Sequence, residues 1–180
     1  MIKDIQSEIL KLKKEKNITI LAHSYQAREI TEIADYVGDS YQLSVMAKGD
    51  KNKTCIMCGV HFMAETVKIL SPEKKVILAN PISGCPMAEQ IEPEFVEAFK
   101  IKNPEYTVVA YINTTAKLKT VCDVCVTSAT AVKICERIPN KNLLFLPDCN
   151  LGAYVAKQLP EKNIHLMQGG CPIHASVNAS

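Results

Sequence analysis

The sequence predicts an α/β fold built from tandem three-layer αβα units with parallel sheets. Short, continuously apolar runs, such as residues 18–22 and 76–79, alternate along the chain with longer amphipathic segments. Continuous apolar runs are typical of strands that are buried on both faces, as in parallel sheets. Strands that alternate with helices form right-handed βαβ units, in which the helices cover the faces of the sheet.

The helices and strands are expected in regular succession. At residues 2–16 the apolar side chains recur with a helical period and lysines fill other positions, which predicts an amphipathic helix. Further helices are expected at residues 27–37, 40–48, 62–70, 93–102, 129–138 and 150–159. Apolar runs interpreted as strands occupy residues 18–22, 54–57, 76–79, 107–110, 121–126, 143–146 and 163–167.

The two halves of the chain also resemble each other. The order helix, proline-containing turn, strand and polar residue occurs at residues 67–80 and again at residues 132–148. The sequence therefore predicts two related α/β domains, residues 1–85 and 86–170, with residues 171–180 opening a third. Chance similarity between amphipathic βα segments is the alternative explanation.

The overall composition narrows the possible partners and the compartment. The net charge is +2, and the lysines between residues 11 and 16 fit the solvated face of a helix, so nucleic acid is not an expected partner. No apolar run approaches the ~20 residues that cross a bilayer, and the polar N-terminus does not resemble a signal peptide. We therefore expect a cytoplasmic protein with no membrane partner, in which the eight cysteines stay reduced.

The tripeptide Gly-Cys-Pro occurs twice, around Cys85 and around Cys171, each time after a strand-like run. Glycine permits a positive φ and proline delays the next element, so each cysteine is expected on an exposed turn at the end of a strand. Such a thiol suits a metal or cluster ligand better than a packed core position.

The other cysteines give weaker indications. The pairs Cys55/Cys58 and Cys122/Cys125 have the spacing of zinc ligands, so a zinc or redox protein is one alternative. However, residues three apart on a strand point to opposite faces, which disfavours chelation by the first pair. Cys135 and Cys149 are expected to pack as small apolar side chains.

Polar residues follow several predicted strands. In open α/β sheets, ligands bind beyond the carboxyl ends of the strands. His23 could be an ordinary core histidine, but the similar placement of Tyr25, Tyr111 and Asn113 favours a site. The segments 38–40 and 127–128 resemble helix N-termini, where capping and anion binding are both possible.

Motifs spread over nearly the whole chain resemble one family, quinolinate synthase, the A protein of bacterial NAD biosynthesis. The matching segments are residues 21–26, 33–40, 58–66, 83–85, 111–114, 123–128 and 146–152. The resemblance implies condensation of iminosuccinate with dihydroxyacetone phosphate to quinolinate, a transferase reaction. L-aspartate oxidase or aspartate dehydrogenase would be the upstream enzyme. The resemblance to this family also implies a fold of three α/β domains around a pseudo-threefold axis. A central [4Fe–4S] cluster held by one cysteine from each domain would act as a Lewis acid.

The resemblance also implies roles for individual residues. Cys85 and Cys171 correspond to two of the three cluster ligands, and Tyr25 to a tyrosine that assists proton transfer. The residues that correspond to substrate binders are His23, Ser40, Tyr111, Asn113 and Ser128.

The sequence departs from the family in one respect. The family's third domain carries a His-x-Glu motif, an anion-binding threonine and the third cluster cysteine, and the chain as given stops at Ser180 without them. The expectation is a truncated enzyme that alone makes little quinolinate. The alternative is a non-catalytic α/β remnant that binds ligand or cluster weakly.

Overall fold

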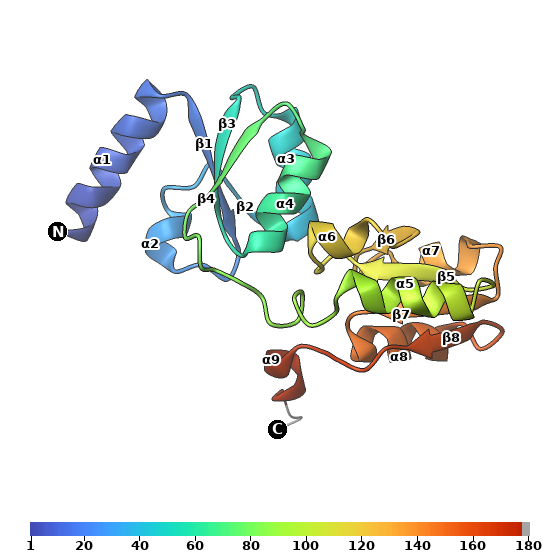
Figure 1. The fold of residues 1–180 in the computed structure, drawn as a ribbon. Helices are drawn as coiled ribbons and strands as arrows, with labels where there is room; N and C mark the ends of the chain where they lie inside the picture. Colours follow the sequence, from blue (N-terminus) through green and yellow to red (C-terminus); the bar gives the residue numbers. More distant parts are fainter. Residues whose placement is uncertain (178–180) are drawn as a thin grey trace. The chain divides into compact units, whose positions relative to one another are not determined.

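The computed structural model describes residues 1–177, which form two compact units. The first unit comprises Met1–Gly84, and the second begins at Cys85 (Figure 1). Each unit contains one parallel, four-stranded sheet, which confirms the predicted α/β class with parallel sheets. Within the described part of the chain, no helix combines the length and apolar character that spanning a bilayer requires.

The first unit is built on a sheet with the strand order β2-β1-β3-β4. Its strands are β1 (Ile18–His23), β2 (Tyr36–Gly38), β3 (Thr54–Cys58) and β4 (Lys75–Leu78). Its helices are α1 (Ile2–Glu15), α2 (Arg28–Thr31), α3 (Ser40–Gly49) and α4 (His61–Leu70). Figure 1 shows α3 and α4 on one side of this sheet and α1 on the other.

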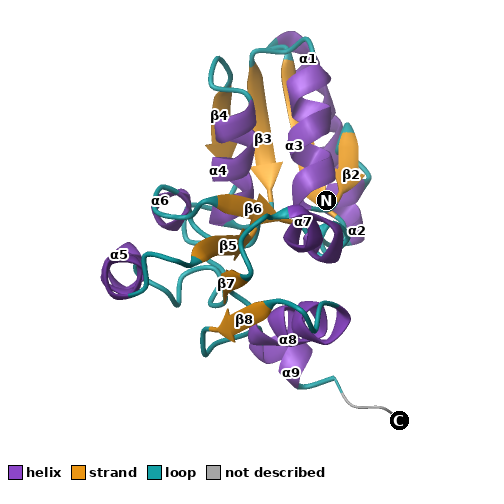
Figure 2. Cartoon of the chain, turned by 90° about the vertical axis from the view of Figure 1, so that its right-hand side faces the viewer, coloured by secondary structure: helices purple, strands orange, loops and turns teal. Residues whose placement is uncertain are grey.

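The second unit has a sheet of the same topology, with the order β6-β5-β7-β8. Its strands are β5 (Thr107–Tyr111), β6 (Val124–Val126), β7 (Asn142–Leu146) and β8 (Asn163–Leu166). Its helices are α5 (Pro93–Lys102), α6 (Ala116–Lys119), α7 (Ala131–Arg137), α8 (Cys149–Gln158) and α9 (Pro172–Ala175). Figure 2 shows α5 on one side of these strands and α7 and α8 on the other.

The two units repeat each other in detail as well as in strand order. Asp35, before β2, accepts the backbone N–H of Ile20 at 2.8 Å, and Asp123, before β6, accepts that of Val108 at 2.8 Å. In both units a lysine then pairs with that carboxylate and also donates to a backbone carbonyl nearby. This agreement supports a duplicated α/β unit over chance similarity.

The central strand β7 explains why the strands read as continuous apolar runs. Leu143 and Phe145 belong to one buried cluster, together with α7 and α8 side chains such as Val155. Leu144 and Leu146 belong to the cluster on the opposite face, which includes side chains from α5. Because both faces of the strand are covered, neither set of alternating residues needs to be polar.

Three segments differ from the predictions. The helix predicted at residues 27–37 is limited to α2, and Tyr36–Gly38 forms the edge strand β2 instead. The cause is Asp35, whose backbone N–H and carboxylate both bond to Ile20 and so hold the following residues against β1. The sequence also gave no sign of the short helix α6, and within the run 121–126 only Val124–Val126 is a strand.

Candidate functional site

The carboxyl end of β1 presents His23, which is the last residue of that strand. The His23 ring meets the Tyr25 ring edge-on, with 4.4 Å between the ring centroids. The backbone N–H of Tyr25 lies 3.4 Å from His23 Nδ1 and donates to it. Because Nδ1 accepts this bond, the proton of the neutral ring is on Nε2, where it can be donated to a ligand.

Burial controls the charge of His23. Desolvation lowers the pKa of His23 below its ordinary value of 6.5, and the nearby Asp39 carboxylate raises it by a smaller amount. The ring is therefore mainly neutral at pH 7. A neutral imidazole can donate a hydrogen bond through one nitrogen and also accept a proton, which suits a polar or acid–base role.

We expect the His23 proton resonance to titrate with a midpoint below 6.5 in a pH series followed by NMR. Asp39→Asn should lower the midpoint further, because it removes the charge that raises the pKa and still allows capping of α3. Asp4→Asn, at an exposed carboxylate in α1, serves as the control and should leave the midpoint unchanged. A midpoint at or above 6.5 in the wild type would contradict the effect of burial.

Ser40 is the first residue of α3 and is buried. The preceding Asp39 caps this helix by accepting the backbone N–H groups of Tyr41 and Gln42, and Gln42 completes a capping box. Capping is therefore confirmed at residues 38–40. Ser40 lies two residues after β2, and Ser128 lies two residues after β6, so the repeat places these two serines at equivalent positions.

In the second unit, Tyr111 is the last residue of β5, at the position that His23 has in β1. The backbone N–H of Ile112 donates to Val126 at 2.8 Å, which holds the turn that carries Asn113 beside the end of β6. Tyr111, Asn113 and Ser128 thus lie at the carboxyl ends of neighbouring strands, with Tyr111 and Asn113 half-buried and Ser128 exposed.

The helix start predicted at residues 127–128 is wrong. Helix α7 begins at Ala131, and Thr130 occupies the N-cap position without a side-chain capping bond to the helix. The Thr130 hydroxyl is bonded to Thr127, which closes a turn over Ser128. Ser128 is therefore presented by a turn and not by the first turn of a helix.

Two hydrogen bonds fix the turn that carries Cys171. Asp148, the N-cap of α8, accepts the backbone N–H of Leu151 with one oxygen and that of Cys171, at 3.3 Å, with the other. The backbone N–H of Cys149 donates to Gly169 at 2.9 Å. Asp148 is buried, and its carboxylate positions Cys171. In the sequence, the only sign of this role was its place two residues after the predicted strand 143–146.

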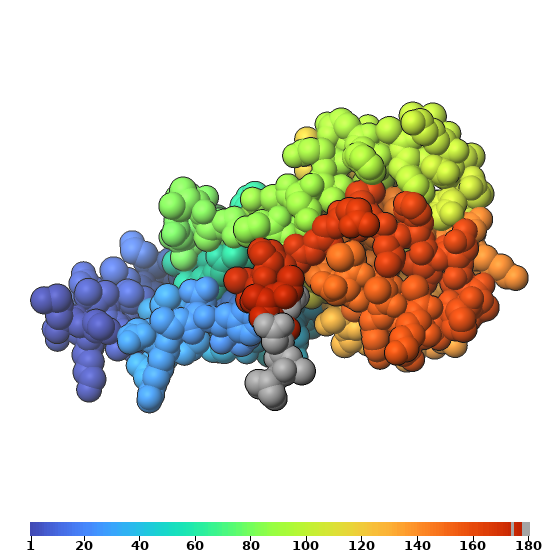
Figure 3. Space-filling model, turned by 90° about the horizontal axis from the view of Figure 1, so that it is seen from below, coloured from blue at the N-terminus to red at the C-terminus, as the bar shows by residue number. Residues whose placement is uncertain are grey.

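The segment after Cys85 packs against the same turn. Gly169 has a φ of 133°, and any side chain there would collide with the amide of Gln90. Figure 3 shows the yellow-green chain that follows Gly84 next to the orange-red chain that leads to α9. Cys85 and Cys171 are both half-buried free thiols of the second unit, and the contact between Gln90 and Gly169 joins the segments that carry them.

The arrangement of the remaining cysteines corrects one prediction. Cys135 is fully buried in the core, as expected, but Cys149 is only half-buried and lies at the start of α8 beside Gly170. Among the described residues, no group of three or more His, Cys, Asp or Glu side chains is placed to hold a metal ion. The assignment of Cys85 and Cys171 as cluster ligands stays a prediction.

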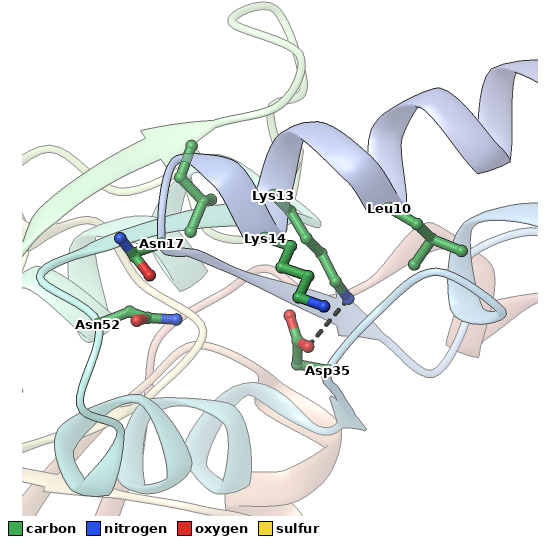
Figure 4. A pocket seen from close by; sticks show the side chains of 7 residues that line it. Leu10, Lys13, Lys14, Asn17, Asp35 and Asn52 are labelled. Carbon is green, nitrogen blue, oxygen red and sulfur yellow. Dashed lines mark hydrogen bonds and ion pairs between the residues drawn. The ribbon is translucent and has the colours of Figure 1, made fainter.

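A pocket of about 360 Å³ lies elsewhere in the first unit. Figure 4 shows it at the amino end of β1, where Lys13 pairs with Asp35 at 2.9 Å. The side chains around it are Leu10, Lys13, Lys14, Asn17, Ile18, Asp35 and Asn52. It is at the opposite end of the strand from His23, so it is not part of the candidate site.

Comparisons with known proteins agree with the motifs. The family model of the quinolinate synthetase A protein matches residues 7–180. The chain is 50% identical over 174 residues to a quinolinate synthase of Clostridium acetobutylicum, covering 97% of this chain and 57% of the relative. It is 51% identical over 179 residues to that of Clostridioides difficile, covering 99% and 59%, respectively.

A third relative gives the same result. The quinolinate synthase of Aquifex aeolicus is 50% identical over 173 residues, which cover 96% of this chain and 54% of the relative. The chain thus spans somewhat more than half the length of the relatives that it matches. With motifs, fold and sequence identity in agreement, the chain belongs to the quinolinate synthetase A family.

Proposed function

We propose that this chain forms two α/β domains of a quinolinate synthase, which condenses iminosuccinate with dihydroxyacetone phosphate to quinolinate. The residues after Cys171 would begin a third domain; residues 178–180 lie outside the described part of the chain. The observation that carries the proposal is the contact between the Cys171 turn and the segment after Cys85. Both cysteines occur in a Gly-Cys-Pro tripeptide, and the chain belongs to a known family, which supports their assignment to one shared site.

The two thiols suit an iron–sulfur cluster in chemical type but are fewer than the ligands that such a cluster takes. Thiolates are the preferred ligands of such clusters, and both Cys85 and Cys171 are free, half-buried and carried by turns. When bound, a [4Fe–4S] cluster would supply a Lewis acid for substrate oxygen atoms. Because two thiolates are fewer than a cluster normally takes, we expect these 180 residues alone to hold it weakly.

The side chains at the strand ends would bind and orient the substrates. Neutral His23 donates from Nε2, which suits a carboxylate of iminosuccinate, and Ser40, buried at the start of α3, is the second proposed binder of that substrate. Tyr111, Asn113 and Ser128 offer hydroxyl and amide groups for further substrate contacts.

Tyr25 is the proposed proton-transfer residue. Its side chain is 86% exposed, while its ring edge rests on His23, so the hydroxyl can reach a ligand and the ring retains a fixed contact. A phenol that exchanges a proton with bound substrate would act as a general acid–base group. The alternative function is weak binding of ligand or cluster without catalysis.

Anaerobic reconstitution with iron and sulfide tests the proposal. We expect the wild-type chain to take up iron and sulfide with charge-transfer absorbance, at less than the about four irons of a full cluster. Cys85→Ser and Cys171→Ser should each reduce the bound iron to background, because a serine hydroxyl is a poor ligand for this cluster. The same samples, supplied with both substrates, should form little quinolinate.

Cys125→Ser is the matched control, because Cys125 is an exposed thiol of the same unit that lies outside the proposed site. It should bind as much iron as the wild type. Equal iron uptake by the wild type, Cys85→Ser and Cys171→Ser would refute the ligand assignment. Preferential uptake of zinc would instead support the CxxC alternative.

A further inference from the structure

Cys149 lies beside the turn that carries Cys171, a placement that the proposed reaction does not use. Its backbone N–H donates to Gly169 at 2.9 Å, and the neighbouring Asp148 accepts the N–H of Cys171 at 3.3 Å. One backbone bond, at Gly169, and one bond from the Asp148 side chain, at Cys171, thus join the two segments on either side of Gly170. A backbone hydrogen bond such as that from Cys149 to Gly169 holds two chain segments about 5 Å apart at that point, and a disulfide requires Cα atoms within about 7 Å.

The position of the Cys149 sulfur agrees with this backbone arrangement. A Cβ atom added to Gly170 would lie 3.5 Å from Cys149 Sγ, so the sulfur is in contact range of the residue directly before Cys171. Glycine leaves this side of the turn open to the sulfur. Cys149 and Cys171 are both free and half-buried, so small reagents can reach them.

We propose that Cys149 and Cys171 form a reversible disulfide that withdraws Cys171 from iron binding. The disulfide itself depends only on the geometry above. The withdrawal of an iron ligand rests on the proposed function, because it requires Cys171 to be such a ligand. Cluster binding would then depend on the ratio of thiols to disulfides in the surrounding solution.

A small disulfide, such as oxidised glutathione, is the oxidant. The thiolate of Cys171 attacks one sulfur atom of oxidised glutathione. A mixed disulfide between Cys171 and glutathione forms, and the other glutathione leaves as a thiolate that takes up a proton. The thiolate of Cys149 then attacks the Cys171 sulfur and expels the second glutathione as a thiolate, which also takes up a proton. Two protein thiols are oxidised and one small disulfide is reduced to two thiols, so atoms and electrons balance.

Mapping of the disulfide in the iron-free 180-residue chain tests the bond. The chain is equilibrated in glutathione buffers of increasing oxidised fraction, free thiols are alkylated, and the digest is analysed by mass spectrometry. We expect a peptide that links Cys149 to Cys171, a fall by two in the eight titratable thiols, and full reversal by dithiothreitol. Cys149→Ser should abolish the linked peptide, and Cys125→Ser, at an exposed thiol, should retain it.

Two results would overturn the bond. One is alkylation of both Cys149 and Cys171 at every buffer ratio in the folded chain, and the other is a Cys171 disulfide to Cys85 instead. The withdrawal of Cys171 from iron binding is tested separately. Oxidation of the chain before reconstitution with iron and sulfide should reduce iron uptake by the wild type and not by Cys149→Ser. If the reduced wild type takes up no iron, the proposed function fails, whereas the mapped peptide would still establish the disulfide.

Discussion

Replacing Phe145 by alanine is expected to lower the free energy of unfolding of the second unit by about 3–5 kcal/mol, the usual range for a buried phenylalanine. Phe145 is fully buried in β7, among side chains from both neighbouring strands and from α7 and α8. A Cβ atom on Gly152 of α8 would lie only 3.0 Å from the Phe145 ring, so helix and ring are in close contact. Alanine would leave a cavity at the centre of this interface.

Denaturant unfolding measures the loss, and peptide-resolved hydrogen exchange locates it. Phe145→Ala should reduce protection in peptides of the second unit and leave those around Leu21 and Leu43, the buried core of the first unit, protected. Phe95→Ala is the control in the same unit, since Phe95 is 60% exposed on α5 and should change stability little. Equal loss of protection in both units after Phe145→Ala would show that they unfold together.

The same burial explains why most of the fold could be predicted from the sequence. Strands such as residues 143–146 are apolar at every position because alternate side chains enter two different core clusters. This pattern depends only on local sequence. The ends of parallel strands lie at one edge of a sheet, so the placement of His23 and Tyr111 at strand ends could also be predicted.

The features that were missed depend on contacts between distant residues. The edge strand β2 has only three residues, and its place is set by the bonds from Asp35 to Ile20, which leave no periodic pattern. Cys149 is half-buried beside Gly170, and the approach of the Cys85 segment to Cys171 depends on Gln90 and Gly169. None of these pairs is marked in the sequence by spacing or composition.

A lysine that precedes the last strand of each unit gives the second large prediction. Lys74 precedes β4, is only 4% exposed, and donates to the backbone carbonyls of Asp50 and Asn52. Lys162 precedes β8 and donates in the same way to the carbonyls of Ile138 and Asn140. Each ammonium group therefore joins the start of an edge strand to the loop before the neighbouring strand.

Lys74→Met should lower the free energy of unfolding by about 1–3 kcal/mol for each carbonyl oxygen left without a donor. Methionine keeps a long aliphatic side chain, so the loss reports the hydrogen bonds more than the packing. Lys162→Met should have an effect of the same sign in the second unit. Urea unfolding of both variants and of the control Lys75→Met, at an exposed neighbouring position, measures the difference.

The comparison also tests what the internal repeat means energetically. If the two lysines have the same role, both methionine variants will be clearly less stable than Lys75→Met, and each will lose hydrogen-exchange protection first in its own unit. Stability of Lys74→Met equal to that of Lys75→Met would contradict the role assigned to the buried ammonium. A loss for only one of the two lysines would show that the units share a hydrogen-bonding pattern but depend on it to different extents, because the packing around each lysine has diverged.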